Sequence, residues 1–429
     1  MPDTLSVAPP ALGTDQQAVY DCVMQGGNAL ISGPAGTGKS FLLERCVRDL
    51  RQQGKCVAVT ASTGIAALNV GGSTIHSFLG TGLAGSLADL RQRRPNLDEK
   101  RHLDRRLGEI QVLVIDEVSM LTGDYVDMMD HWLGYARQRR HHLDVQPFGG
   151  VQLILCGDFL QLPPVQVPTA PKAEHLYAFE ATAWEAAQIR PFLLQQNFRQ
   201  ADAGFVSHLL RLRRGEVALD TRAFFQPCVR RVLDQPTWLT ARNDTAQAHN
   251  LAELDRLPGH ALGFKATFTG DEPWQEALRK NCIAEPIVRL KAGAPVILLK
   301  NDSELGIVNG MRGTVMSATP HDVIVRLPSG ADVALARATW QHCDAEGRVL
   351  ATMRQYPVKL AWALTIHKSQ GLTLDRVRCN LAQVFEAGHA YVALSRVRSV
   401  DGLSLDHPLI GAHIRAAARA AEFYERLAA

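Results

Sequence analysis

Short runs of consecutive apolar residues recur through the first half of the chain, separated by polar or helix-patterned segments. Four of these runs predict strands, at Asn28–Ile31, Cys56–Thr60, Val112–Ile115 and Val151–Cys156. Strands of a parallel sheet carry continuous apolar runs because helices cover both faces of the sheet. The alternation therefore predicts an α/β domain with a parallel sheet.

The pattern changes twice after Pro191. A second α/β run is predicted to begin with a strand at 191–194 and to continue through a helix and a strand to about residue 244. From Leu290 to about Tyr356, short strands are split by PHD and PSG turns, as in a β-meander. The α/β pattern then returns and ends with a helix at about 411–428. We predict a small β-barrel inserted into a second α/β domain.

Composition sets broad limits. The chain has 429 residues with 46% hydrophobic and 21% charged residues, which fits a soluble globular protein. No apolar run approaches the ~18 residues of a membrane span, and the first residues do not resemble a signal peptide. Eight scattered cysteines without a CxxC pair favour reduced thiols over a disulfide frame or a cysteine zinc site. We expect a cytoplasmic protein that is not associated with a membrane.

Charge gives a weaker indication. The net charge is +3, which does not by itself identify a nucleic-acid binder. Basic residues cluster at 91–106, 137–142 and 211–214. Such runs are commonly solvated helix faces, and contact with DNA is the alternative.

The stretch GPAGTGKS at Gly33–Ser40 matches the phosphate-loop pattern G-x-x-x-x-G-K-[ST]. Its glycines allow backbone N–H groups to surround an anion, and the following helix directs its N-terminus at the same anion. Lys39 would reach the outer phosphates, and the Ser40 hydroxyl would bind Mg²⁺. A strand-like run precedes the loop and a helical run follows it, as this motif requires.

Two further strand ends carry polar residues. The run VLVIDE ends in Asp116, which could hold Mg²⁺, and Glu117, which could orient or deprotonate the attacking water. After the next strand, in GDFLQLPPV, Gln161 could sense the γ-phosphate, or it could simply be a buried turn residue.

The segment before the first predicted helix has two possible roles. Thr14 and Gln17 fit a capping box, which is structural. Gln16 is not needed for that cap and could bind adenine.

Late in the chain, the apolar run in ALTIHKSQGLT ends abruptly in polar residues at 367–371. Hydroxyls, an imidazole and backbone N–H groups suit contacts with phosphates.

These motifs, in this order, resemble superfamily 1 helicases of group B, and more narrowly the Pif-type (petite integration frequency) family, with RecD-like relatives. Besides the phosphate loop, VLVIDEVSM and LTIHKSQGLTLD, the resemblance rests on VTASTGIAALNVGGSTIHSF, CGDFLQLPPV, NFRQ and YVALSRVRS. It implies two RecA-like P-loop NTPase domains with ATP between them and an SH3-like β subdomain inserted in the second. The predicted parts are 1–191 for the first domain, 192–289 with 357–429 for the second, and 290–356 for the insertion. A smaller insertion in the first domain is expected at 80–108.

The resemblance also implies roles for individual residues. Those expected to act on ATP are Lys39, Asp116, Glu117, Gln161, Arg199 and Arg396, with Ser40 and Asp116 on Mg²⁺. Those expected to bind the nucleotide are Gln16, Gly36, Thr37, Gly38, Lys39, Ser40 and Gly371. Those expected to contact the DNA backbone are Ser62, Thr63, His76, Thr365, His367 and Ser369. For the two arginines, a surface salt bridge is the alternative.

The expected activity is that of a monomeric ATP- and Mg²⁺-dependent helicase that moves 5′→3′ on single-stranded DNA and opens duplexes and forks. A translocase that separates duplex poorly would have the same ATP site. A DNA-binding module with weak ATPase is a third possibility, but it would not require paired arginines across the cleft.

Overall fold

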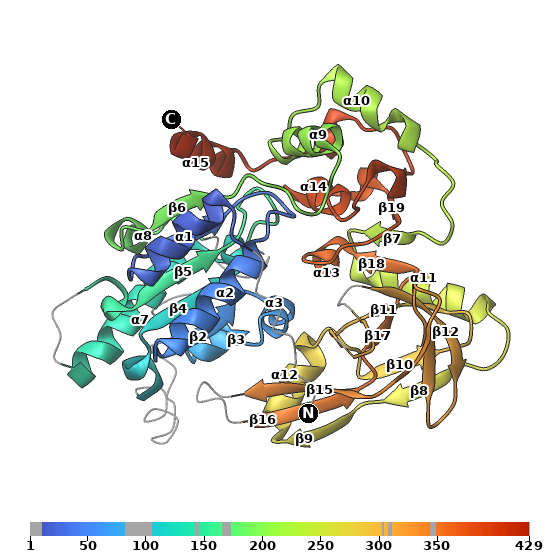
Figure 1. The fold of residues 1–429 in the computed structure, drawn as a ribbon, viewed down its shortest axis with the longest axis horizontal. Coiled ribbons are helices and arrows are strands. Elements are labelled where there is room, and N and C mark those ends of the chain that lie inside the picture. Colours follow the sequence, from blue (N-terminus) through green and yellow to red (C-terminus); the bar gives the residue numbers. More distant parts are fainter. Residues whose placement is uncertain are drawn as a thin grey trace.

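The computed structural model describes residues 11–81, 105–141, 146–164, 173–302, 304–307, 311–343 and 349–428. Most of the insertion expected at 80–108 and the basic run at 91–106 lie outside these ranges. Figure 1 shows two groups of helices and strands, with a set of longer antiparallel strands beside the second. Among the described helices, none combines the length and apolarity needed to cross a bilayer.

The first sheet has six parallel strands in the order β3-β2-β4-β5-β1-β6. They are β1 (Ala29–Ser32), β2 (Val57–Ala61), β3 (Ser73–Thr74), β4 (Val112–Asp116), β5 (Gln152–Cys156) and β6 (Arg190–Leu193). The apolar runs predicted from the sequence thus form its central strands, with ends that differ by a residue or so. Loops carrying polar residues leave the carboxyl ends of β1, β2, β4 and β5, where ligands of such sheets bind.

Helices cover both faces of this sheet. On one face lie α1 (Thr14–Met24) and α2 (Lys39–Gln52), which share a hydrophobic core with Val112 and Val114 of β4. On the other face, Leu113 and Ile115 belong to a core that includes residues of α7 (Gly123–His141), α8 (Thr182–Ala186) and α15 (Ala418–Ala428). Successive strand side chains point to opposite faces, so a continuous apolar run fills both cores.

Two features of this unit differ from the sequence prediction. The strand at 191–194, predicted to start the second α/β run, is β6, and it pairs with β1 at the edge of the first sheet. The boundary at 191/192 therefore cuts a strand of that sheet. The C-terminal helix α15 packs on the first unit, where Phe423 stacks on Phe179 at 4.3 Å between ring centroids. Figure 1 shows α15 beside the first group of elements.

The second sheet has four parallel strands in the order β18-β7-β19-β20. They are β7 (Thr237–Thr240), β18 (Ala363–Thr365), β19 (Val377–Cys379) and β20 (Leu403–Leu405). The helices of this unit are α9 (Ala203–Arg213), α10 (Leu219–Phe225), α11 (Asn243–Arg256), α13 (Ile366–Ser369) and α14 (His389–Leu394). Two α/β units with parallel sheets are therefore present, as the RecA-like prediction requires.

The inserted β region is larger than 290–356. Its antiparallel five-stranded sheet, in the order β14-β13-β12-β11-β17, surrounds a core of its own. These strands are β11 (Pro295–Leu298), β12 (Arg312–Ala318), β13 (Val323–Arg326), β14 (Asp332–Leu335) and β17 (Val358–Leu360). The remaining elements of the region are β8 (Leu262–Lys265), β9 (Thr267–Gly270), α12 (Glu272–Asn281), β10 (Ile287–Leu290), β15 (Ala338–Cys343) and β16 (Val349–Gln355). The meander is present, and its SH3-like character stays a prediction.

Candidate functional site: a nucleotide cavity between two α/β units

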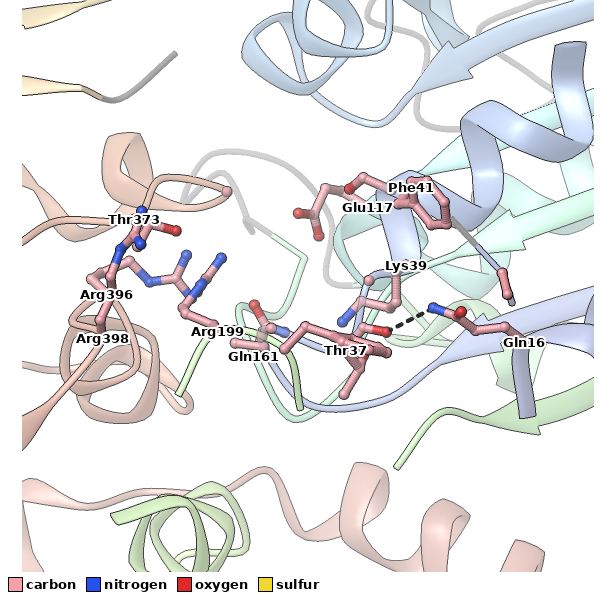
Figure 2. Close-up of a pocket in the computed structure, with 17 residues that line it drawn as sticks. Gln16, Thr37, Lys39, Phe41, Glu117, Gln161, Arg199, Thr373, Arg396 and Arg398 are labelled. Atoms are coloured by element: carbon pink, nitrogen blue, oxygen red, sulfur yellow. Dashed lines mark hydrogen bonds between the residues drawn. The ribbon is translucent and has the colours of Figure 1, made fainter. Parts of the chain in front are cut away.

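A cavity of about 610 Å³ lies where the phosphate loop meets the second α/β unit. Most of the residues predicted to act on ATP line it, with the exception of Asp116, together with six residues that the sequence did not single out. The predicted ones are Gln16, Gly36, Thr37, Gly38, Lys39, Ser40, Glu117, Gln161, Arg199, Gly371 and Arg396, and the additional ones are Ala11, Ala35, Phe41, Phe198, Thr373 and Arg398. Figure 2 shows Arg199, Arg396 and Arg398 on one side, facing Lys39 and Glu117 across the cavity.

The phosphate loop needs glycine for two reasons. Gly36 and Gly38 have φ values of 86° and 78°, a region that residues with a side chain rarely adopt. A Cβ at Gly36 would also lie 2.7 Å from Cβ of Arg199. Lys39 at the start of α2 donates hydrogen bonds to the carbonyls of Gly33 and Pro34, at 2.7 and 2.9 Å. Its ammonium group thus lies inside the loop, and burial lowers its pKa.

Asp116 and Glu117 stand at the carboxyl end of β4. The Asp116 carboxylate accepts a hydrogen bond of 2.9 Å from the Glu117 N–H. Glu117 itself has a left-handed backbone, with φ 53° and ψ 42°. This uncommon conformation for a residue with a side chain starts the turn into the following 3-10 helix, Val118–Met120. Burial, and next the nearby Asp116 charge, raise the pKa of Glu117 to about 8.

The two predicted arginines meet beside the cavity. Arg199 donates to the Ser395 carbonyl at 3.1 Å, so it already reaches the second unit. Arg396 follows α14 and is 1% exposed, with Nε donating to the Val392 carbonyl at 2.7 Å. Burial, and next the charge of Arg199, lower the pKa of Arg396 to about 9. No carboxylate forms a salt bridge with Arg199 or Arg396, so the simple salt-bridge alternative does not apply to these two described residues.

Gln16 does more than the sequence suggested. The N-cap of α1 is Gly13, and Gln16 Oε1 accepts from the Gly13 N–H at 3.1 Å. The predicted capping box of Thr14 and Gln17 is therefore wrong by one residue, because the helix starts at Thr14 itself. Gln16 Nε2 also donates to the Thr37 carbonyl at 3.5 Å, a bond marked by the dashed line in Figure 2, so Gln16 both caps α1 and lines the cavity.

A buried ion pair that the sequence analysis missed lies behind Gln161. Asp158 is 1% exposed and accepts bonds of 2.6 and 2.9 Å from Arg213 of α9. Gln161 donates to the same carboxylate at 3.0 Å, and Tyr424 of α15 lies 3.3 Å from it. These bonds fix the Gln161 side chain at the cavity edge. Asp158 lies in the quoted GDFLQLPPV stretch, but nothing local identifies Arg213 as its partner.

The basic run at 211–214 is thereby accounted for. Arg211 pairs with Asp220, Arg213 with Asp158, and Arg214 with Glu216. All three arginines of this run have carboxylate partners, which leaves no free basic patch there.

The predicted DNA residues of the first unit lie in the segment that follows β2, and Ser62 contacts Glu117. Ser62 follows β2 and donates to the Glu117 carbonyl at 2.7 Å. Thr63 accepts from the Ala66 N–H at 3.2 Å, at the start of α3 (Gly64–Asn69). His76, in α4 (Ile75–Phe78), packs on Tyr125 with ring centroids 4.5 Å apart, and burial lowers its pKa.

Those of the second unit lie on α13 or at its start. Thr365 caps α13, and Ser369 is fully buried with its hydroxyl bonded to the Ile366 carbonyl at 2.8 Å. His367 is partly exposed. A second cavity of about 370 Å³ is lined by Thr365 and by two lysines that the sequence reading did not select, Lys359 and Lys368. Burial lowers the pKa of Lys368 to about 8, with Lys359 adding to the effect.

One hydrogen bond joins the two groups of predicted residues. Gln370, directly after α13, donates from Nε2 to Oε2 of Glu117 at 3.0 Å. Through Gln370 and Ser62, both segments predicted to contact DNA also contact Glu117.

Comparisons with known proteins identify relatives of this chain. A PIF1-like helicase family model matches residues 11–222, and a model of the DNA helicase Pif1 2B domain matches residues 274–317. The ATP-dependent DNA helicase Pif1 of Bdellovibrio bacteriovorus is 36% identical over 397 residues, which cover 92% of this chain and 87% of that protein. The ATP-dependent DNA helicase PIF1 of Danio rerio is 39% identical, and the match covers 91% of this chain. The chain spans 60% of the length of that fish protein.

Solved structures show the same likeness along nearly the whole chain. Pif1 helicase from Candida albicans has a TM-score of 0.77 with 33% identity, covering 98% of this chain and 100% of that one. Pif1 from Bacteroides sp in complex with ADP-AlF4 has a TM-score of 0.85 with 26% identity, covering 98% of both. With a relative of 36% identity matched over most of both chains, this chain belongs to the PIF1-like family of ATP-dependent DNA helicases.

Proposed function

We propose that the chain moves 5′→3′ on single-stranded DNA and separates duplexes, including forks, with ATP hydrolysed in the cavity between the two α/β units. One observation carries this proposal: Lys39 and Glu117 of the first unit and Arg396 of the second line one cavity. A site divided in this way makes closure of the units depend on the nucleotide. Among the relatives, a Bacteroides Pif1 structure is described as bound to single-stranded DNA.

Each side of the cavity has a task in hydrolysis. Lys39 would leave the Gly33 and Pro34 carbonyls for the outer phosphates. Glu117, made basic by its burial, would orient the attacking water and take its proton. Arg199 and Arg396 would stabilise negative charge on the transferred phosphoryl group. After hydrolysis their contacts with that group would be lost, which would favour reopening of the units.

The residues at the phosphate loop also fit a magnesium ion. Ser40 is exposed toward the cavity, and Asp116 ends β4 at the same edge of the sheet, so the available donors are hydroxyl and carboxylate oxygens. Mg²⁺ prefers oxygen ligands of this kind, completed by water and phosphate. When bound, the ion supplies charge that neutralises the phosphate oxygens.

The DNA path would follow the segments that reach Glu117. Lys368 would supply positive charge for the phosphates, while Thr365 and His367 add polar contacts. Lys359 is paired with Glu285 at 3.2 Å and would contribute less. Binding through phosphates predicts an affinity that falls steeply with salt.

The direct test is strand separation of matched duplexes that carry either a 5′ or a 3′ single-stranded tail, with ATP and Mg²⁺. We expect only the 5′-tailed duplex to open. Opening of only the 3′-tailed duplex would refute the polarity. If neither duplex opens while DNA still stimulates the ATPase, a translocase that separates duplex poorly is favoured. An ATPase rate that does not change on addition of DNA would contradict both the helicase and the translocase.

The Gln370–Glu117 bond predicts how DNA stimulates hydrolysis. A donor on the Glu117 carboxylate occupies an oxygen that must accept the proton of water, so Gln370 restrains the base until DNA moves α13. We expect Gln370→Met to raise the DNA-free ATPase rate by roughly 5–10-fold, which corresponds to the net value of one hydrogen bond, about 1 kcal/mol. The ratio of DNA-stimulated to DNA-free rates should fall accordingly.

Steady-state ATPase with and without oligo(dT) measures that ratio. Gln383→Met provides the matched control, since Gln383 is exposed in the second unit. An unchanged DNA-free rate in Gln370→Met would show that the bond does not restrain Glu117.

A further inference from the structure

Three metal-ligating side chains meet in the second unit, and none of them lines the nucleotide cavity. His367 lies on α13, Glu386 lies in the loop before α14, and His389 is the first residue of α14. His367 Nε2 is 3.4 Å and His389 Nε2 is 3.2 Å from the same oxygen, Oε2 of Glu386. One ligand atom from each residue lies within 4.8 Å of the others.

These distances match a metal coordination sphere. Ligands at ~2.0–2.1 Å from a tetrahedral zinc ion lie about 3.3 Å from one another. Both nitrogen–oxygen separations in the cluster are within about a tenth of an ångström of that spacing. The two imidazole nitrogens lie within 4.8 Å of each other, and they would move closer together to complete the triangle.

Three buried polar atoms of the cluster, on Glu386 and His389, also lack hydrogen bonds. His389 is 0% exposed, yet neither of its ring nitrogens has a hydrogen bond of acceptable geometry in the described structure. Glu386 Oε2 is likewise buried without such a bond. Buried polar groups are nearly always satisfied, because an unpaired one costs about 1–3 kcal/mol. A bound cation would satisfy the carboxylate oxygen and one nitrogen of each imidazole together.

We propose that His367, Glu386 and His389 bind a divalent transition-metal ion of the Zn²⁺ class. Two imidazoles and one carboxylate are a ligand set that zinc uses, with water in the fourth position. The side chains of His367 and Glu386 are 31% and 29% exposed, so an ion and its water can enter from solvent. Nitrogen ligands disfavour Mg²⁺, which separates this site from the oxygen ligands Ser40 and Asp116.

Cobalt(II) provides a direct probe, because it takes the place of zinc and absorbs visible light strongly when four-coordinate. Metal-free protein carrying Cys56→Ser, which removes an exposed thiol, is titrated with Co²⁺ in the absence of nucleotide. We expect saturable absorption at one equivalent, abolished by added Zn²⁺. His389→Gln and Glu386→Gln should each weaken binding by at least about tenfold, since loss of even an outer partner of a metal site costs ~10–100-fold.

His131→Gln is the matched control, because His131 is an exposed histidine on α7 of the first unit. It should leave the titration unchanged. Circular dichroism identifies any variant that has not folded, and the partly exposed Glu386 keeps the test usable if His389→Gln fails to fold. Absence of the visible bands, or bands that persist in both cluster variants, would overturn the site.

A consequence for DNA follows, and it rests on the proposed function. If His367 contacts the DNA backbone, an ion that holds its imidazole should weaken oligo(dT) binding several-fold in wild type and not in Glu386→Gln. Fluorescence anisotropy with and without Zn²⁺ measures this. Metal binding without any change in DNA affinity would contradict the DNA role of His367 and leave the metal site standing.

Discussion

Arg396→Ala should lower the DNA-stimulated kcat for ATP by ~10³–10⁵, the range found for arginines that stabilise transferred phosphoryl charge. Arg396 lines the cavity opposite the phosphate loop, and burial together with Arg199 lowers its pKa to about 9. Because burial disfavours the charged guanidinium group, the stabilisation of that group is greatest when negative charge develops beside it. Because that gain is specific to the transition state, kcat should fall far more than KM rises.

The control for this variant lines the same cavity. Arg398 is exposed, so Arg398→Ala removes an equal charge at lesser burial and should cost much less activity. Arg396 also donates to the Val392 carbonyl, so thermal unfolding must be compared between the variants. A folded Arg396→Ala protein that retains more than a tenth of the wild-type kcat would remove this arginine from the chemistry.

Glu117→Gln should reduce kcat by ~10²–10⁴, the usual contribution of a positioned general base, while nucleotide binding persists. The pH dependence is a sharper test. Because the pKa of Glu117 is raised to about 8, the free protein holds this carboxyl mostly protonated at neutral pH. For wild type, kcat/KM should rise about tenfold per pH unit up to about pH 8 and then level, since kcat/KM reports groups of the free enzyme.

The same shift has a stability counterpart with a defined sign. A carboxyl whose pKa is higher in the folded than in the unfolded state favours folding below the unfolded value of ~4.3, and this contribution is lost as pH rises toward 8. Glu117→Gln should therefore be more stable than wild type at pH 8–9 and equal to it near pH 4. If the residual activity of Glu117→Gln still rises with pH as in wild type, the group that titrates is not Glu117.

The sequence predicted the central strands of the first sheet and the phosphate loop because both depend on local pattern. An apolar run such as Val112–Ile115 needs only its neighbours to be recognised, and G-x-x-x-x-G-K-S carries its own geometry. Arg199 and Arg396 were predicted from the resemblance to the helicase family, and in the structure both line the cavity.

What the sequence missed depends on contacts between distant residues. Nothing near Arg213 indicates that it reaches Asp158, and nothing near β6 distinguishes the last strand of one sheet from the first strand of another. The cap of α1 was misplaced because Thr14 looks like a better N-cap than Gly13, whereas the Gln16 side chain supplies the missing bond. Thr365 and Ser369 were expected to contact DNA. In this structure the Thr365 hydroxyl caps the N-terminus of α13, and the Ser369 hydroxyl donates to the Ile366 carbonyl within α13.

The C-terminal helix has a consequence for how the protein is made. Ala420, Phe423 and Tyr424 complete the core of the first unit, although the ribosome delivers them after the whole second unit. Until they emerge, Phe159 and its aromatic neighbours lack a covering surface, and the Ser32 hydroxyl lacks its 2.5 Å contact with the Tyr424 hydroxyl. Domains usually fold in order of synthesis, from the N-terminus. Here the nascent first unit would expose this apolar surface until α15 has been synthesised.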